Sequence, residues 1–289
     1  MSQKTQPLRP ASGPVTAESS QDAILQRIGE LPPAPVVVVK LITLAEDPRV
    51  MINRLVEVVR YDQALTARLL RLCSSSFMGL REPVEDLREA IWYLGTTTVR
   101  KVALLSQRTY LLHAVPEAER ELQKSLWEHA AAVALASQRL AEKVGGVAPG
   151  AAFTAGVFHD LGMFALHEYV DEDSEPSLEP ADDSLSHAEI GARIAQHWDL
   201  PGYVVQAIRY HHAPSLAGEF RRIASVIHVA DIVARRAGLG VLPVGEIEPA
   251  LESGTLDALS LAQGDVQELV LALPGDLLVA KKMLSLSGG

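Results

Sequence analysis

The feature that most constrains this chain is a set of titratable side chains placed inside otherwise apolar helical segments. His159 and Asp160, for example, directly follow the apolar residues 155–158. Such groups are costly to bury unless they pair with one another or bind a metal ion. Because they lie on separate segments, they can compensate one another only where the segments converge. The set comprises five histidines and two aspartates: His129, His159, Asp160, His187, His211, His212 and Asp231.

The apolar residues of the chain favour helix packed on helix. Hydrophobic residues make up 48% of the 289 residues, but aromatic residues only 5%, so that Ala, Leu and Val dominate. Ala and Leu have high helix propensity, and the apolar positions recur with helical rather than strand spacing. The sequence therefore predicts an all-α fold.

The first part of the chain predicts a bundle of short helices. Asp62 is the expected N-cap of one of them, Gly95 ends another, and Thr96 or Thr97 begins the next. The expected helices cover residues 36–44, 52–59, 64–72, 87–94 and 97–105, with a further short helix near residues 20–27.

The second part predicts longer and more apolar helices. Ser186 is the expected N-cap of one helix, and Pro201 opens the next. These helices are expected at residues 117–143, 151–158, 187–194, 201–211 and 223–236, with two or three amphipathic segments after Pro243.

Two polar segments are expected to lie outside the packed core. Residues 1–20 are typical of a disordered tail. Residues 171–183 carry seven acidic and no basic side chains, which is typical of a solvated loop.

The charge and cysteine content bound the environment of the chain. A formal net charge of −10 argues against a nucleic-acid or membrane-surface partner, since both would require a basic patch. Cys73 is the single cysteine, so no intramolecular disulfide is possible. No apolar run is long enough to span a bilayer or to form a secretory signal. A cytoplasmic location is therefore expected.

Imidazole nitrogens and carboxylate oxygens together form a ligand set for Fe, Mn, Zn or Ni. Two such ions bridged by a carboxylate would suit hydrolysis of a phosphate ester. A single histidine is more often an ordinary hydrogen-bonded residue, and only the whole set favours a metal site. The remaining histidines are His113, His167, His197 and His228, and we interpret His228 as a neighbour of Asp231 on one helix face rather than as a ligand.

Several short motifs follow one another along the chain. They are Leu-Pro-Pro-Ala-Pro at 31–35, the segment 62–77, Ala-Ile with Leu-Gly at 90–95, Gly-Val-Phe-His-Asp-Leu-Gly at 156–162, the segment 187–192, Trp-Asp-Leu-Pro at 198–201 and Ala-Ile-Arg-Tyr-His-His at 207–212. In order and spacing these motifs resemble the HDOD domain proteins, a divergent branch of the HD phosphohydrolase superfamily, over roughly residues 25–235.

The resemblance implies an N-terminal helical bundle packed on an HD-like helical subdomain. The implied division is a disordered tail at 1–20, an HDOD domain at 21–235 with subdomains 21–112 and 113–235, and a C-terminal helical extension at 236–289. It implies a bacterial signalling module that acts without catalysis and has a protein partner.

The same resemblance implies roles for the titratable set. By similarity to the HD pattern, one metal ion would be held by His129, His159, Asp160 and Asp231. By similarity to the HD-GYP phosphodiesterases, a second ion would be held by His187, His211 and His212, with Asp160 bridging. One or two divalent transition-metal ions are therefore expected.

Two departures from the HD-GYP pattern weigh against catalysis. Met163 stands where those enzymes have a lysine that binds substrate phosphate, and Ala213-Pro214 follows the paired histidines in place of the Gly-Tyr-Pro loop. The alternative function is a metal-dependent phosphohydrolase, with a cyclic dinucleotide as one candidate substrate and a nucleotide as a candidate ligand.

Overall fold

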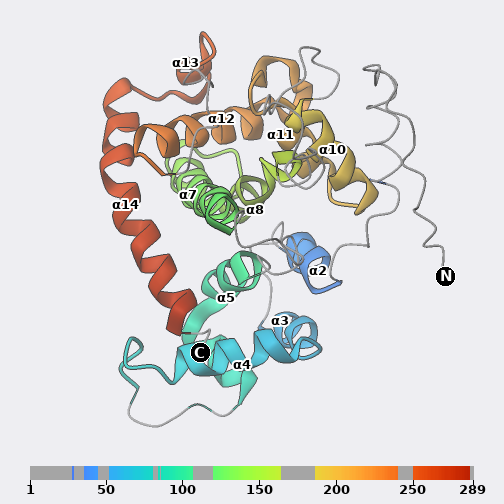
Figure 1. The fold of residues 1–289 in the computed structure, drawn as a ribbon, viewed down its shortest axis with the longest axis vertical. Coiled ribbons are helices and arrows are strands. Elements are labelled where there is room, and N and C mark those ends of the chain that lie inside the picture. Colours follow the sequence, from blue (N-terminus) through green and yellow to red (C-terminus); the bar gives the residue numbers. More distant parts are fainter. Residues whose placement is uncertain are drawn as a thin grey trace, which may run out of the picture. The chain divides into compact units, whose positions relative to one another are not determined.

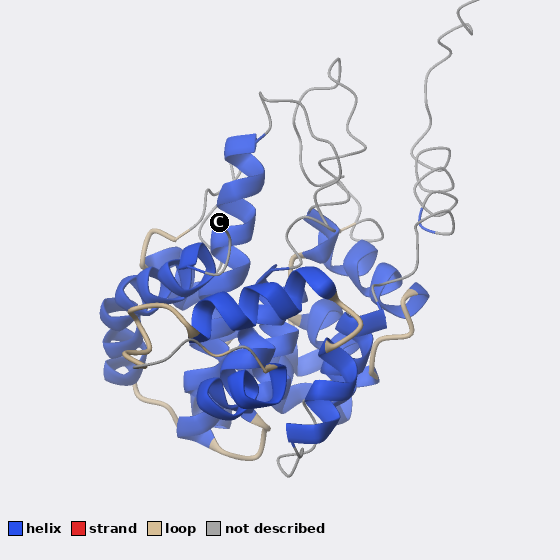
Figure 2. Ribbon diagram, turned by 90° about the horizontal axis from the view of Figure 1, so that it is seen from below, coloured by secondary structure: helices blue, strands red, loops and turns tan. Residues whose placement is uncertain are grey.

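The structure is a computed structural model that describes Ile28 and residues 36–44, 52–80, 84, 86–106, 120–163, 186–239 and 250–286. The expected tail at 1–20, the short helix near 20–27 and the acidic loop at 171–183 lie outside these residues. All elements below belong to one unit, residues 33–289. Every regular element in the described part is a helix, which confirms the all-α prediction (Figure 2).

Four of the described helices form the N-terminal group, coloured blue to blue-green in Figure 1. Leucine and isoleucine side chains from all four form its core, for example Leu41, Leu55, Leu69 and Ile91. The helices are α2 (Val36–Leu44), α3 (Ile52–Val59), α4 (Gln63–Cys73) and α5 (Leu87–Ser106).

A helix cap and a helix break in this group lie where the sequence predicts them. The Asp62 carboxylate accepts a hydrogen bond of 2.9 Å from the Leu65 amide and so caps α4. Gly95 has φ 75° and ψ 155°, which breaks the helical geometry inside α5. A positive φ is readily adopted only by glycine, so this residue bends the chain where the sequence expects one helix to end.

The second group of helices, green to orange in Figure 1, contains the sequence-predicted site residues. The Ser186 hydroxyl accepts a hydrogen bond from the Glu189 amide at the start of α10, as predicted. The helices are α7 (Arg120–Val144), α8 (Pro149–Phe158), α10 (His187–His197), α11 (Gly202–Tyr210) and α12 (Arg221–Arg236), with the 3-10 turns η3 (Pro214–Leu216) and η4 (Gly218–Phe220) between the last two.

The chain then continues through α13 (Thr255–Leu259) to the long helix α14 (Gln263–Leu286). Helix α14 contacts α7 and α12 and also reaches α4 and α5 (Figure 1). Its residues Met283 and Leu284 pack against the core of the N-terminal group. Helix α14, in the expected C-terminal extension, therefore contacts both groups of helices.

No helix in the described ranges combines the length and the apolar character needed to cross a membrane.

Two glycines allow segments of the second group to pack closely against one another. A Cβ atom at Gly156 would lie 2.7 Å from the Ala134 Cα, so α8 can approach α7 this closely only with glycine at this position. A Cβ atom at Gly162 would lie 1.9 Å from the His187 carbonyl oxygen and 2.8 Å from the Gly191 amide nitrogen. The segment that follows Asp160 is therefore held directly against the start of α10.

Substituting Gly162→Ala is expected to lower the free energy of unfolding by about 1–3 kcal/mol or more, because backbone must move to admit the methyl group. Thermal unfolding followed by circular dichroism measures the change. Gly275→Ala is the matched control, since Gly275 is exposed inside α14 with nothing within 4 Å of the added Cβ, and alanine there should stabilise slightly. Equal melting temperatures for the two variants would contradict the close contact.

Candidate metal centre

Three helices bring together the first group of sequence-predicted site residues. His129 lies on α7, His159 at the C-cap of α8, and Asp231 on α12. All three are buried, with 6%, 0% and 1% of their surface exposed. One ligand atom from each lies within 4.8 Å of the others. The structure thus places these three as a potential tridentate site.

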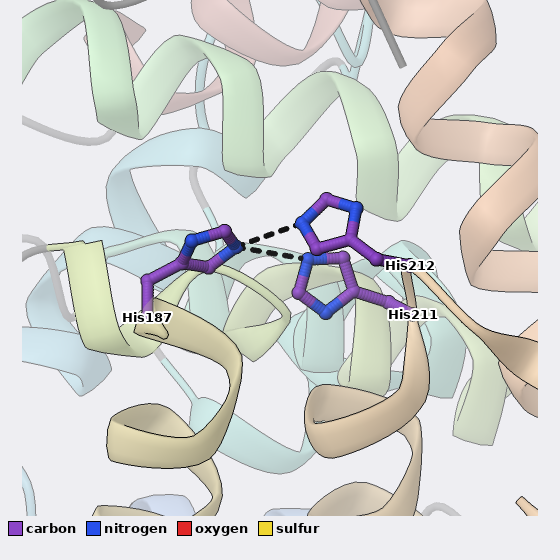
Figure 3. Close-up of side chains that lie close together, drawn as sticks. All are labelled: His187, His211 and His212. Carbon is purple, nitrogen blue, oxygen red and sulfur yellow. Dashed lines mark hydrogen bonds between the residues drawn. The ribbon is translucent and has the colours of Figure 1, made fainter. Parts of the chain in front are cut away.

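A second group lies at the facing ends of α10 and α11 (Figure 3). His187 opens α10, while His211 and His212 follow α11. The His187 Nε2 atom lies 3.2 Å from the His211 Nε2 and 2.9 Å from the His212 Nε2. This group also satisfies the 4.8 Å separation.

Asp160 lies between the two groups. Its Oδ2 atom is 3.2 Å from the His159 Nε2 and 3.6 Å from the His129 Nε2. Its Oδ1 atom is 3.4 Å from the His187 Nε2 and 3.5 Å from the His211 Nε2. One carboxylate therefore faces each group with a different oxygen, so that all seven sequence-predicted residues come together.

Backbone carbonyls fix the tautomers of three of these histidines. The Nδ1–H groups of His159 and His211 donate to the carbonyls of Gly156 and Ile208 at 2.9 and 2.6 Å. The His129 Nδ1–H likewise donates to Leu239 at 2.9 Å. A carbonyl can only accept, so each Nδ1 carries the proton. Each ring is thereby oriented with its Nε2 toward the cluster, as in metal-binding histidines whose other nitrogen is hydrogen-bonded.

Several buried atoms of the cluster have no hydrogen-bond partner within the described residues. These are the His159 Nε2, the Asp160 Oδ1 and the Asp231 Oδ2. Buried polar atoms are rarely left unsatisfied. An ion in the first group would satisfy the His159 and Asp231 atoms, and an ion in the second group would satisfy the Asp160 Oδ1 atom, which faces His187 and His211.

The ionisation of the cluster suits metal binding. Burial alone would raise the pKa of the Asp160 carboxyl, but His159 and His211 outweigh burial and hold it well below its usual range. The same opposition, with His129 as the strongest partner, lowers the pKa of Asp231. Burial lowers the pKa of His211, and it lowers the pKa of His212 to about 2 together with the neighbouring imidazoles. Ionised carboxylates and neutral imidazoles are the ligand forms.

His129 behaves differently because its partner is an anion. Burial lowers its pKa, but the hydrogen bond of 2.9 Å to the Asp231 carboxylate and the negative charges of Asp231 and Asp160 together outweigh burial, and the net shift is upward. Arg235 Nε donates to the same oxygen of Asp231 at 2.8 Å. Sequence reasoning missed Arg235, although its position four residues after Asp231 on one helix is a recognisable ion-pair signal.

The distances in the second group and around Asp160 fit a transition-metal ion, while in the first group the His159 Nε2 and Asp231 Oδ1 atoms are 4.0 Å apart. Ligand atoms about 2.1 Å from a common ion lie about 3.0–3.5 Å from one another in octahedral or tetrahedral geometry. The nitrogen–nitrogen distances in the second group are 2.9 and 3.2 Å, and the four contacts of Asp160 span 3.2–3.6 Å.

The four histidines interpreted as lying outside the set fall into three cases. His113 and His167 lie outside the described residues. His197 is exposed at the end of α10. His228 is buried, and both its nitrogens bond to backbone: Nδ1–H donates to the His211 carbonyl at 2.7 Å, and Nε2 accepts from the Glu252 amide at 2.9 Å. His228 therefore holds the chain around the cluster and does not belong to it.

Met163, at the position of the phosphate-binding lysine of HD-GYP enzymes, is 5% exposed. Its side chain belongs to the core.

The sequence was compared with protein families and with known proteins. The family model of the HDOD domain matches residues 31–214. An uncharacterized protein of Treponema pallidum (strain Nichols) is 28% identical over 228 residues, which are 74% of this chain and 44% of that protein. The chain thus spans less than half the length of this relative.

Solved structures share the fold. An HDOD domain protein of unknown function from Geobacter sulfurreducens has a TM-score of 0.65 and 22% identity, covering 92% of this chain and 98% of its own. A candidate signal transduction protein from Marinobacter aquaeolei VT8 has a TM-score of 0.70 and 22% identity, covering 94% and 66%. A candidate phosphohydrolase from Shewanella amazonensis SB2B has a TM-score of 0.61 and 22% identity, covering 91% and 98%.

The role of His228 leads to a stability prediction. His228→Ala leaves the buried His211 carbonyl and the partly buried Glu252 amide without their partner, and about 1–3 kcal/mol of unfolding free energy should be lost for each group that water cannot reach. Urea unfolding measures the difference. The control, His197→Ala, removes an exposed imidazole and should change stability by less than about 0.5 kcal/mol. A His228→Ala protein as stable as wild type would show that these bonds carry no stability.

Proposed function

The chain belongs to the HDOD family, and we propose that it is a signalling module whose buried histidine–aspartate cluster holds one or two divalent transition-metal ions without turning over a substrate. One observation carries the metal proposal. Histidine rings that backbone carbonyls hold through Nδ1 direct their Nε2 atoms toward the Asp160 carboxylate. Fe, Mn, Zn and Ni all suit such imidazole and carboxylate donors.

The proposed ligands follow from the two groups around Asp160. His129, His159 and Asp231 would hold one ion, and His187, His211 and His212 the other. Asp160 would face both with its two oxygens, which lie 3.2 and 3.4 Å from the nearest imidazole nitrogen of each group. Arg235, bonded to Asp231, would keep that carboxylate oriented.

Two features support a non-catalytic role. The first group and Asp160 are enclosed, with His129, Asp160 and Asp231 at most 6% exposed, and closed metal sites in proteins are typically structural. The phosphate-binding lysine expected of a related phosphodiesterase is replaced by the buried Met163. A protein partner is the proposed means of signalling, since the net charge of −10 disfavours nucleic acid.

A metal-dependent phosphohydrolase is the second candidate, and the completeness of the ligand set favours it. Metal ions in such a site would supply Lewis-acid activation of a phosphate ester and of the attacking water. The Shewanella amazonensis protein of the same fold is itself a candidate phosphohydrolase. Of the histidines in the second group, His212 is the more exposed, so a substrate would have to approach from its side.

The purified wild-type protein is expected to contain one or two transition-metal ions per chain, measured by elemental mass spectrometry. Asp160→Asn keeps the shape of the side chain but removes the charge that faces both groups, and the metal content should fall below about a tenth of wild type. His197→Ala should keep its metal. A wild-type protein that stays metal-free after incubation with Fe(II), Mn(II), Zn(II) and Ni(II) would contradict the metal proposal.

The metal-loaded protein is expected to hydrolyse neither bis(p-nitrophenyl) phosphate nor cyclic dinucleotides faster than the metal-stripped protein does. Release of nitrophenol and chromatography of the nucleotides measure the two rates. Hydrolysis that depends on added metal and disappears in Asp160→Asn would overturn the non-catalytic proposal and establish the phosphohydrolase.

A further inference from the structure

A second site lies away from the histidine cluster, in a cavity of about 280 Å³ between α5, α7 and the first turn of α8. We call it the basic pocket. It is lined by Leu55, Thr96, Thr97, Arg100, Lys101, Leu104, Gln138, Glu142, Ala148, Pro149, Gly150, Phe153 and Thr154. Its size is close to the lower end of the range of small-molecule sites, about 300–1,000 Å³.

Two cations line the pocket without ion-pair partners. Within the described residues no carboxylate lies at ion-pair distance from Arg100 or Lys101, and both side chains are only partly exposed. Burial lowers the pKa of each group. The Lys101 Nζ atom lies 5.7 Å from the centre of the Phe153 ring, a cation–π contact that leaves its charge without a counterion in the described part of the chain. An anionic ligand would supply the missing counter-charge for both cations.

The acidic lining residue, Glu142, does not neutralise both cations. Its Oε1 atom accepts a hydrogen bond of 2.7 Å from the Gln138 amide nitrogen. The formal charge of the lining is therefore positive, even though the whole chain carries −10.

The first turn of α8 adds uncapped donors to the same cavity. Ala148 is its N-cap, has extended backbone geometry and offers no side-chain hydrogen bond. The first amide of this turn to bond back is that of Ala152, to the Ala148 carbonyl at 3.0 Å. Pro149 has no N–H, so the amides of Gly150 and Ala151 lack helical partners. A helix of ten residues directs its positive dipole end here.

We propose that the basic pocket binds a small metabolite through a phosphate monoester group. Arg100 would contact two phosphate oxygens through its planar guanidinium, Lys101 would contribute a point charge, and the Gly150 amide would donate as amides at helix N-termini do to phosphate. A phosphate monoester offers three terminal oxygens for these donors, one more than a carboxylate.

The lining also indicates what the phosphate is attached to. The Gln138 Oε1 atom is buried without a hydrogen-bond donor among the described residues, and a ligand hydroxyl would satisfy it. Leu55 and Leu104 supply a short apolar wall. A hydroxylated phosphate ester of sugar size, such as a pentose phosphate, matches both features and the volume.

The basic pocket is separate from the proposed metal centre. The pocket lies at the Pro149 end of α8, whereas His159 and Asp160 follow its Phe158 end. Ten helical residues span about 15 Å. Phosphate binding in the basic pocket therefore does not require a metal ion in the histidine cluster.

Ligand-observed NMR titration of the full chain with ribose 5-phosphate and with inorganic phosphate tests the proposal, with ribose as the uncharged comparison. Both phosphates should bind, and ribose should bind at least about tenfold more weakly than its phosphate. Arg100→Gln and Lys101→Gln should each weaken phosphate binding by about tenfold or more. Lys124→Gln removes an equal charge from an exposed position on α7 and should leave binding unchanged.

A second kind of variant tests the proposal without removing a cation, in case the loss of Arg100 or Lys101 disturbs folding. Ala148→Asp places a carboxylate at the N-cap, where it should cap α8 and occupy the anion position. Its melting temperature should rise while phosphate binding disappears.

Absence of phosphate binding to wild type, or equal weakening in Lys124→Gln, would overturn the proposal. So would binding that survives in the Arg100 and Lys101 variants but is lost in Asp160→Asn, because the phosphate would then occupy the histidine cluster.

Discussion

The Asp160 carboxylate is the interaction on which the arrangement of the second group of helices depends. It is 4% exposed and lies within 3.6 Å of imidazoles from α7, α8, α10 and the end of α11. A buried charge is tolerated only where opposite charges, donors or an ion surround it. Helices that are distant in the sequence must therefore meet at this point, and the Gly162 contact with the start of α10 allows them to approach closely enough.

The backbone prepares the cluster as much as the side chains do. Three carbonyls each hold the Nδ1 proton of a histidine, so the Nε2 atoms of these rings are left facing one another. In the second group, three Nε2 atoms meet around His187, which can share only one proton with its two neighbours at a time. The hydrogen bonds that the described residues offer within this group do not pair all three nitrogens at once, whereas a metal ion would accept a lone pair from each.

The sequence predicted the convergence because titratable residues in apolar helices have few other solutions. It also predicted the Asp62 and Ser186 caps and the break at Gly95, since each depends on residues adjacent in the chain. It did not predict the carbonyl anchors, because any residue offers a carbonyl and only the fold decides which one a ring meets. The basic pocket was missed for a related reason: Arg100 and Lys101 lie on an ordinary amphipathic helix, and the cavity exists only where α8 begins beside them. The division at residues 20, 112 and 235 stays a prediction.

Helix α8 connects the two sites physically. Gly156 fixes it against Ala134 of α7, while its first turn lines the basic pocket and its last residue precedes the His159-Asp160 pair. Helix α7 carries His129 at the cluster and lines the pocket with Gln138 and Glu142, so both sites share the same two walls. A close-packed pair of helices cannot change its separation at one end without disturbing the other. The geometry of the histidine cluster and the shape of the basic pocket therefore depend on one and the same helix contact.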